Sequence, residues 1–143
     1  MSDTYNLHRF LDAQENAYQA ALTEIKNGRK TSHWMWFIFP QVAGLGFSET
    51  SKFYAIKSRA EAVAYLNHPV LGKRLFEITE ALLTLKGKSA SQIFGSPDDM
   101  KLKSSMTLFN AVSTGNPVFQ KVLDKYFNGE PDQKTLQLLA QEN

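Results

Sequence analysis

The sequence predicts an all-α protein that forms one domain over residues 1–143, with about six or seven helices. Three observations support this fold class. Apolar residues recur every three or four positions in most segments, which is the period of one face of a helix. Capping residues precede these segments, and Gly or Pro stands at their ends. No Asn-Gly or Asp-Gly pair lies between two segments of alternating polarity, so no β-hairpin is expected.

The first predicted helix has a continuous apolar face near the N-terminus. Ser2, Asp3 or Thr4 can cap its start. Gly28 suits its end, because glycine readily takes the left-handed conformation that follows a helix. The apolar face consists of Leu7, Phe10, Leu11, Ala17, Tyr18, Ala21, Leu22 and Ile25.

Two further helices are expected in the middle of the chain. Ser58 and Glu61 have the spacing of a capping box, which predicts a short helix through Leu66. Pro69 suits the first turn of a longer helix that ends at Gly87. The apolar face of that helix consists of Leu71, Leu75, Ile78, Leu82 and Leu85.

Each remaining helix is expected to begin at a capping residue, namely Ser89, Ser96, Asn116 and Asp132. The first of these helices is a short turn, for which Ser89 and Gln92 form a capping box. In the next helix Pro97 suits the first position. Asp98 and Asp99 suit the first turn, where the helix dipole favours negative charge.

Polar side chains fall on the apolar face of two predicted helices. At 100° per residue, Asp98, Lys101 and Ser105 share an arc with Leu102 and Phe109. An inward polar group costs desolvation free energy unless it is hydrogen-bonded. We therefore predict a polar pocket in the interior, beside the tryptophans, and expect Asp98 and Lys101 to pair across it. The residues expected to line it are Gln14, Asp98, Lys101 and Ser105.

The alternative is that these polar groups have structural roles only. Ser105 can bond back to the carbonyl of Lys101, and Asp98 can serve the start of its helix. The opposite side of that helix, with Lys103 and Thr107, is expected to face solvent.

An aromatic segment at residues 33–41 contains both tryptophans of the protein, Trp34 and Trp36. Indole rings suit core packing as well as stacking on a planar ligand. At the polar ends of the segment, His33 could act as an acid or base near neutral pH, and Gln41 could hydrogen-bond a polar edge. The alternative is that the segment is simply the centre of the hydrophobic core.

Composition excludes several classes of protein. The chain has no cysteine, so disulfides, thiolate metal sites and a cysteine nucleophile are excluded. The three histidines, His8, His33 and His68, lack the spacing of metal ligands, so no metal is expected. No nucleotide-binding motif of the Walker A or Gly-x-Gly-x-x-Gly type is present, and no cofactor is expected.

Charge and targeting signals give further expectations. The net charge of +2, from 16 basic and 14 acidic residues, makes nucleic acid an improbable partner. The N-terminus has no signal-peptide pattern, and no apolar run approaches about 20 residues, so we expect a cytoplasmic protein without a membrane partner. The oligomeric state is left open.

The aromatic segment and its neighbours resemble the domain of unknown function 1810, a family of small all-helical bacterial proteins that are sometimes labelled calpastatin. The matching stretches are residues 9–10, Gln14, 33–41, 44–46, Ser48, 54–56, 68–75 and 99–109. The resemblance implies a multihelical fold and no established activity. It also suggests a distant kinship with the YbiA-like, or NADAR, superfamily of helical N-glycosidases that act on ribosyl compounds.

Two functions therefore remain open, and the chain is not assigned as an enzyme. In the first, the pocket binds or hydrolyses a nucleotide-like small molecule of the N-ribosyl or ADP-ribose type. The expected catalytic residues are Asp98, Asp99 and His33, and the expected ligand-binding residues are Gln14, Trp34, Trp36, Gln41, Lys101, Ser104 and Ser105. In the alternative, the protein is a non-enzymatic helical module for binding or protein interaction.

Overall fold

Ten helices and no β-strand make up the part of the chain that the computed structural model describes, residues 3–141. They are α1 (His8–Glu15), α2 (Tyr18–Lys26), α3 (Met35–Ile38), α4 (Glu49–Tyr54), α5 (Arg59–Asn67), α6 (Leu71–Thr84), α7 (Ala90–Phe94), α8 (Asp98–Val112), α9 (Val118–Phe127) and α10 (Gln133–Ala140). The all-α prediction is confirmed. Within this range, none of the helices is long and apolar enough to cross a membrane.

The prediction of six or seven helices was wrong, and three features account for the difference. The first predicted helix is two helices, because the chain turns at Asn16 and Ala17, where the N–H of Ala17 bonds to the carbonyl of Gln14 at 3.1 Å. The aromatic segment contains the short helix α3. Helix α4 follows it, capped by Ser48, whose hydroxyl accepts the N–H of Ser51.

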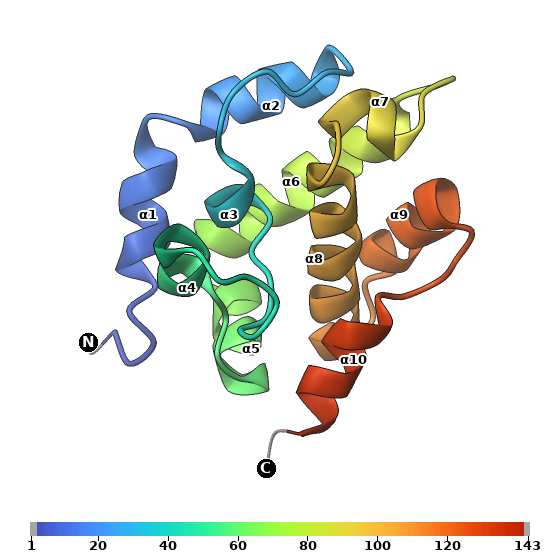
Figure 1. Cartoon of the computed structure of the whole chain (residues 1–143). Helices are drawn as coiled ribbons and strands as arrows, with labels where there is room; N and C mark the ends of the chain where they lie inside the picture. The colour runs from blue at the N-terminus through green and yellow to red at the C-terminus, as the bar shows by residue number, and fades with distance from the viewer. Residues whose placement is uncertain (1–2, 142–143) are drawn as a thin grey trace.

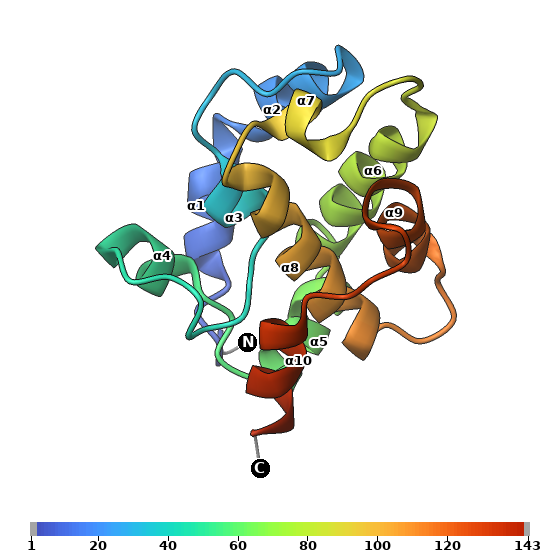
Figure 2. The ribbon, with the colours of Figure 1, turned by 45° about the vertical axis from the view of Figure 1, so that its right-hand side comes forward.

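Helix α8 lies in the middle of the protein. Figure 1 shows it between α1, α3 and α4 on one side and α9 and α10 on the other, and in Figure 2 it again lies between α3 and α9. It packs against α5, α7, α9 and α10, while α6 packs against α2, α5 and α9. Its segment from Ser104 to Phe109 is buried throughout. Thr107, which we expected to face solvent, is covered because the N–H of Asp132 donates to its hydroxyl at 2.8 Å.

The local capping signals are largely confirmed. The hydroxyls of Ser58 and Ser89 and the carboxylate of Asp132 each accept an N–H from the first turn of their helices. Asp3 accepts the N–H groups of Leu7 and His8 at the start of α1. Of the other N-terminal candidates, Ser2 lies outside the described residues. Pro97, not Ser96, precedes α8, and its side chain makes no capping bond.

A long loop joins α3 to α4 and is closed by a short backbone bridge. Val42 and Ile56 form an isolated parallel β-bridge. The N–H of Ile56 donates to the carbonyl of Gln41 at 2.9 Å, and the N–H of Ala43 donates to the carbonyl of Ile56 at 2.8 Å. The bridge therefore fixes the end of the aromatic segment against the segment that follows α4.

A buried ion pair fastens this region to the N-terminus. Arg9 and Glu61 have side chains that are each 4% exposed, and their charged groups lie 2.6 Å apart. The remaining donors of Arg9 bond to the carbonyls of residues 5, 6, 53 and 55. The other carboxylate oxygen of Glu61 accepts the N–H of Lys57 at 2.9 Å, so Glu61 does not complete the capping box expected of it.

The carboxylate of Glu24 holds the loop that leads into the aromatic segment. Its carboxylate accepts the N–H groups of Thr31 and Ser32, the hydroxyl of Ser32 and the indole N–H of Trp34. Burial by itself raises the pKa of Glu24, but the hydrogen bonds from Ser32, Thr31 and Trp34 outweigh it and lower the pKa from 4.5 to about 2.

We predict that Glu61→Gln lowers the free energy of unfolding by about 3–5 kcal/mol, because it leaves the guanidinium of Arg9 buried without its counter-charge. Urea unfolding followed by circular dichroism measures this difference. Glu80→Gln, on the exposed face of α6, is the control and should change stability by no more than about 0.5 kcal/mol. Equal effects of the two variants would contradict the role assigned to the pair.

We predict that Glu24→Gln removes a pH-dependent part of the stability. The folded-state pKa lies below the ordinary value, so the ionised carboxylate stabilises the fold above about pH 4.5, and this contribution disappears as the pH falls toward 2. Because Glu24 is partly exposed, we expect a difference of about 1–2 kcal/mol at pH 7 after solvent screening. Urea unfolding of both proteins from pH 7 to pH 2 tests this. A difference that stays constant down to pH 2 would show that the charge of Glu24 is not its cause.

Candidate functional site

Two pockets lie next to each other and share the side chain of Trp36. One is polar, with a volume of about 340 Å³, and is lined by Lys30, His33, Met35, Trp36, Phe37, Ser48, Thr50, Asp98 and Lys101. The other is mainly apolar, with a volume of about 250 Å³, and lies between the α3–α4 loop and α4. The first volume is near the lower end of the range for small-molecule pockets, about 300–1,000 Å³, and the second is just below that range.

The polar pocket is built around Asp98, at the start of α8. Its carboxylate pairs with Lys30 at 2.9 Å and with Lys101 at 3.1 Å, so the predicted pairing of Asp98 with Lys101 is confirmed. Lys101 also lies over the ring of Trp36, 4.1 Å from its centroid, and Lys30 lies 5.1 Å from the ring centroid of Trp34. Two cations thus connect Asp98 to the two indoles.

The charges of this pocket determine what it can do chemically. Burial raises the pKa of Asp98, but the hydrogen bonds from Lys30 and Lys101 outweigh it, so the pKa lies below its ordinary value. An ionised carboxylate held in this way can stabilise positive charge but is a poor general acid. His33 is exposed at the edge of the pocket.

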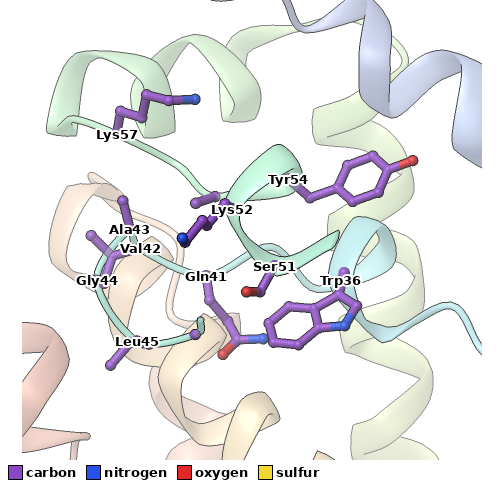
Figure 3. Close-up of a pocket in the computed structure, with 12 residues that line it drawn as sticks. Trp36, Gln41, Val42, Ala43, Gly44, Leu45, Ser51, Lys52, Tyr54 and Lys57 are labelled. Carbon is purple, nitrogen blue, oxygen red and sulfur yellow. The ribbon is translucent and has the colours of Figure 1, made fainter. Parts of the chain in front are cut away.

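The apolar pocket depends on a close approach at Gly46. A Cβ atom there would lie 2.5 Å from Oγ of Ser51 and 3.3 Å from Cη2 of Trp36. Only glycine therefore allows the loop to lie against α4 and the indole at this distance. The walls are formed by Trp36, Tyr54 and the segment from Gln41 to Gly46 (Figure 3).

Gln41 is the residue of this pocket that has a buried polar side-chain atom without a hydrogen bond. The residue is 6% exposed, and its amide nitrogen has no partner. In Figure 3 the amide points toward the six-membered ring of Trp36, below Ser51. An unsatisfied buried donor costs about 1–3 kcal/mol. A carboxamide also offers a donor and an acceptor side by side, which matches the edge of an amide or a nucleobase.

Two lysines complete the lining of the apolar pocket at its surface. Lys52 belongs to the last turn of α4, and Lys57 follows the bridge at Ile56. Both residues are exposed. The lining contains neither an acidic residue nor a histidine.

The structure brings together only some of the predicted site residues. Trp36 lines both pockets, Gln41 lines the apolar pocket, and Asp98, Lys101 and His33 line the polar pocket. The single pocket that we predicted, with Gln14 and Ser105 beside Asp98, does not form, because neither of these residues lines the polar pocket.

The remaining predicted residues have structural contacts instead. Gln14 is buried, and its amide donates to the carbonyl of Phe37 at 2.7 Å and to the hydroxyl of Tyr65 at 3.0 Å. The hydroxyl of Ser104 donates to the carbonyl of Met100 at 3.2 Å. Their side chains are therefore held within the fold.

The other three lie outside both pockets as well. Trp34 is 1% exposed, and its indole N–H donates to Glu24. Asp99 accepts the N–H of Met100 at 2.9 Å. The fully buried hydroxyl of Ser105 has no partner, so the back-bond to Lys101 offered as an alternative is absent.

Sequence reasoning missed several lining residues. Lys30 was not predicted, because it reaches Asp98 only through the folding of the loop after α2. Tyr54 and Lys52 were missed because α4 was not predicted.

Comparison with known proteins shows what the chain is similar to. A family model described as "Protein of unknown function (DUF1810)" matches residues 4–139. The crystal structure of the conserved hypothetical protein Rv1873 from Mycobacterium tuberculosis, at 1.38 Å, is similar with a TM-score of 0.96 and 46% sequence identity, over 98% of this chain and 100% of that chain. None of the curated proteins matches the chain. The chain therefore belongs to the DUF1810 family, as the resemblance of its aromatic segment predicted.

Proposed function

We propose that this protein binds a small molecule with a flat, nitrogen-containing ring, such as the base of a nucleotide-like compound, in the apolar pocket. The observation that carries the proposal is the unpartnered amide of Gln41, buried at the wall of that pocket beside Trp36. A ligand acceptor placed there would remove the cost of the unsatisfied donor.

The shape and composition of the pocket support a flat ligand. Trp36 and Tyr54 offer aromatic surface, and Val42 and Leu45 add apolar contact. Such walls bury a ring, while a single convergent polar group fixes its orientation. Gln41 supplies that polar group. This combination is typical of pockets that discriminate between rings by their hydrogen-bonding edge.

N-ribosyl compounds and ADP-ribose carry rings of this kind, so they are the ligands that we propose to test first. The lining of the apolar pocket has no acidic residue or histidine, so hydrolysis of an N-ribosyl bond would need a residue from outside this pocket. It would require Asp98 of the polar pocket, whose ionised carboxylate could stabilise an oxocarbenium-like charge. We also propose that this protein is distantly related to the helical N-glycosidases of the YbiA-like, or NADAR, superfamily.

We predict that Gln41→Leu weakens ligand binding without weakening the fold. In the unliganded protein the substitution removes an unsatisfied donor, so the free energy of unfolding should stay the same or rise by up to about 1 kcal/mol. Affinity for a ligand that uses the amide should fall about three- to tenfold. Trp36 lines the pocket, so quenching of tryptophan fluorescence reports binding, and Trp36→Phe identifies its source.

The ligand panel comprises the four ribonucleosides, nicotinamide riboside, NAD and ADP-ribose, with chromatography of each mixture to detect a released base. Gln14→Leu is the matched control, because Gln14 is also a buried glutamine but its amide is hydrogen-bonded, so its loss should destabilise the fold. If no member of the panel binds the wild-type protein, or if Gln41→Leu destabilises it as Gln14→Leu does, the proposal is wrong.

A non-enzymatic interaction module is the second candidate function. The side chains of Phe47 and Phe53 are 85% and 53% exposed, and exposed aromatic residues are typical of surfaces that bind a partner. Concentration-dependent self-association that is lost in Phe47→Ser, together with no binding from the panel, would favour this function over the first.

A further inference from the structure

We infer that the ligand of the apolar pocket carries a phosphate group, which binds to Lys52 and Lys57 at the mouth. This inference rests on the proposed function and adds the chemical class of the ligand. A ring alone would use only the inner part of the pocket, whereas a phosphorylated nucleoside would also use its charged edge.

The charge of the lining is the first observation. Two lysines, Lys52 and Lys57, line the pocket, and both are exposed. Neither ammonium group forms an ion pair with a carboxylate among residues 3–141. An apolar pocket with two unpaired cations and no acidic residue in its lining favours an anion with an apolar body.

The neighbouring acids do not neutralise these lysines. Glu61 pairs with Arg9 in the interior and accepts the backbone N–H of Lys57, so its negative charge is balanced by Arg9. Glu49 stands one turn before Lys52 on α4, but it forms no ion pair with Lys52 and does not line the pocket. The positive charge at the mouth is therefore uncompensated by these acids.

The placement of the two lysines is the second observation. Figure 3 shows the side chain of Lys52 beside the segment from Val42 to Gly44, whereas the ammonium of Lys57 points away from the cavity. The four-carbon stem of lysine is flexible, so Lys57 can turn toward a bound phosphate. The amide of Gln41 lies on the inner side, near Trp36, so a ring bonded to Gln41 would direct its substituent toward the lysines.

The lysines of the polar pocket are poorer candidates for binding a phosphate. Lys30 and Lys101 both pair with Asp98, at 2.9 and 3.1 Å. An incoming phosphate would have to compete with this carboxylate and would be repelled by it. The phosphate is therefore assigned to Lys52 and Lys57.

Paired ligands test this assignment. The four ribonucleosides and their 5′-monophosphates are titrated into the wild-type protein and into Lys52→Gln/Lys57→Gln, with tryptophan fluorescence and calorimetry as readouts. We expect one monophosphate to bind the wild-type protein about three- to tenfold more tightly than its nucleoside at 50 mM salt, and this advantage to shrink at 300 mM. The double variant should lose the advantage, so that it binds the monophosphate no more tightly than the nucleoside.

The control variant is Lys26→Gln/Lys86→Gln, which removes the same charge from two exposed lysines that do not line the pocket, and it should keep the advantage. Equal binding of nucleoside and monophosphate would overturn the phosphate assignment but not the proposed function. An advantage that survives in Lys52→Gln/Lys57→Gln would place the phosphate elsewhere. If neither ligand of any pair binds, the proposed function fails and this inference fails with it.

Discussion

The buried ion pair between Arg9 and Glu61 is the interaction on which the candidate site depends. Arg9 uses all five of its N–H donors, four on backbone carbonyls and one on the carboxylate of Glu61. These acceptors belong to the N-terminal segment, to the end of α4 and to the start of α5, so one guanidinium links the N-terminal segment to two neighbouring segments that lie much later in the sequence. Ala55, one of the acceptors, also lines the apolar pocket. A buried pair of this kind adds little net stability, and its effect here is to hold the pocket wall in place.

Some polar side chains that the sequence suggested for a functional site have their hydrogen bonds satisfied within the fold, whereas others are buried without a partner. Gln14 was expected to bind a ligand, yet its amide nitrogen donates to the carbonyl of Phe37 and the hydroxyl of Tyr65, and its amide oxygen accepts from Arg74. Three buried side-chain atoms have no partner among the described residues, in Gln41, Thr79 and Ser105. Thr79 and Ser105 line neither pocket, whereas Gln41 lines the apolar one. Gln41 is therefore the residue at which an unmet hydrogen bond coincides with space for a ligand.

The sequence predicted local features well and tertiary features poorly, for physical reasons. Caps such as Ser89 act over three residues, so their spacing is visible in the sequence. The helical spacing of apolar residues continues across Asn16, so this spacing could not predict the break between α1 and α2. In the site, Asp98 and Lys101 were correctly paired because both lie on one helix. Lys30 was not foreseen, because only the folded chain brings its loop to α8.

Trp36 determines how the two pockets relate to each other. The ammonium of Lys101 lies over its ring in the polar pocket, and the edge of the same indole lies beside Gly46 in the apolar pocket. A ligand held by Gln41 is thus separated from the carboxylate of Asp98 by the indole. Hydrolysis needs a carboxylate within reach of the reacting carbon, so it would require Trp36 to leave the shared wall and give up its contact with Lys101. The proposed binding needs no such movement, whereas the proposed hydrolysis would need a second conformation.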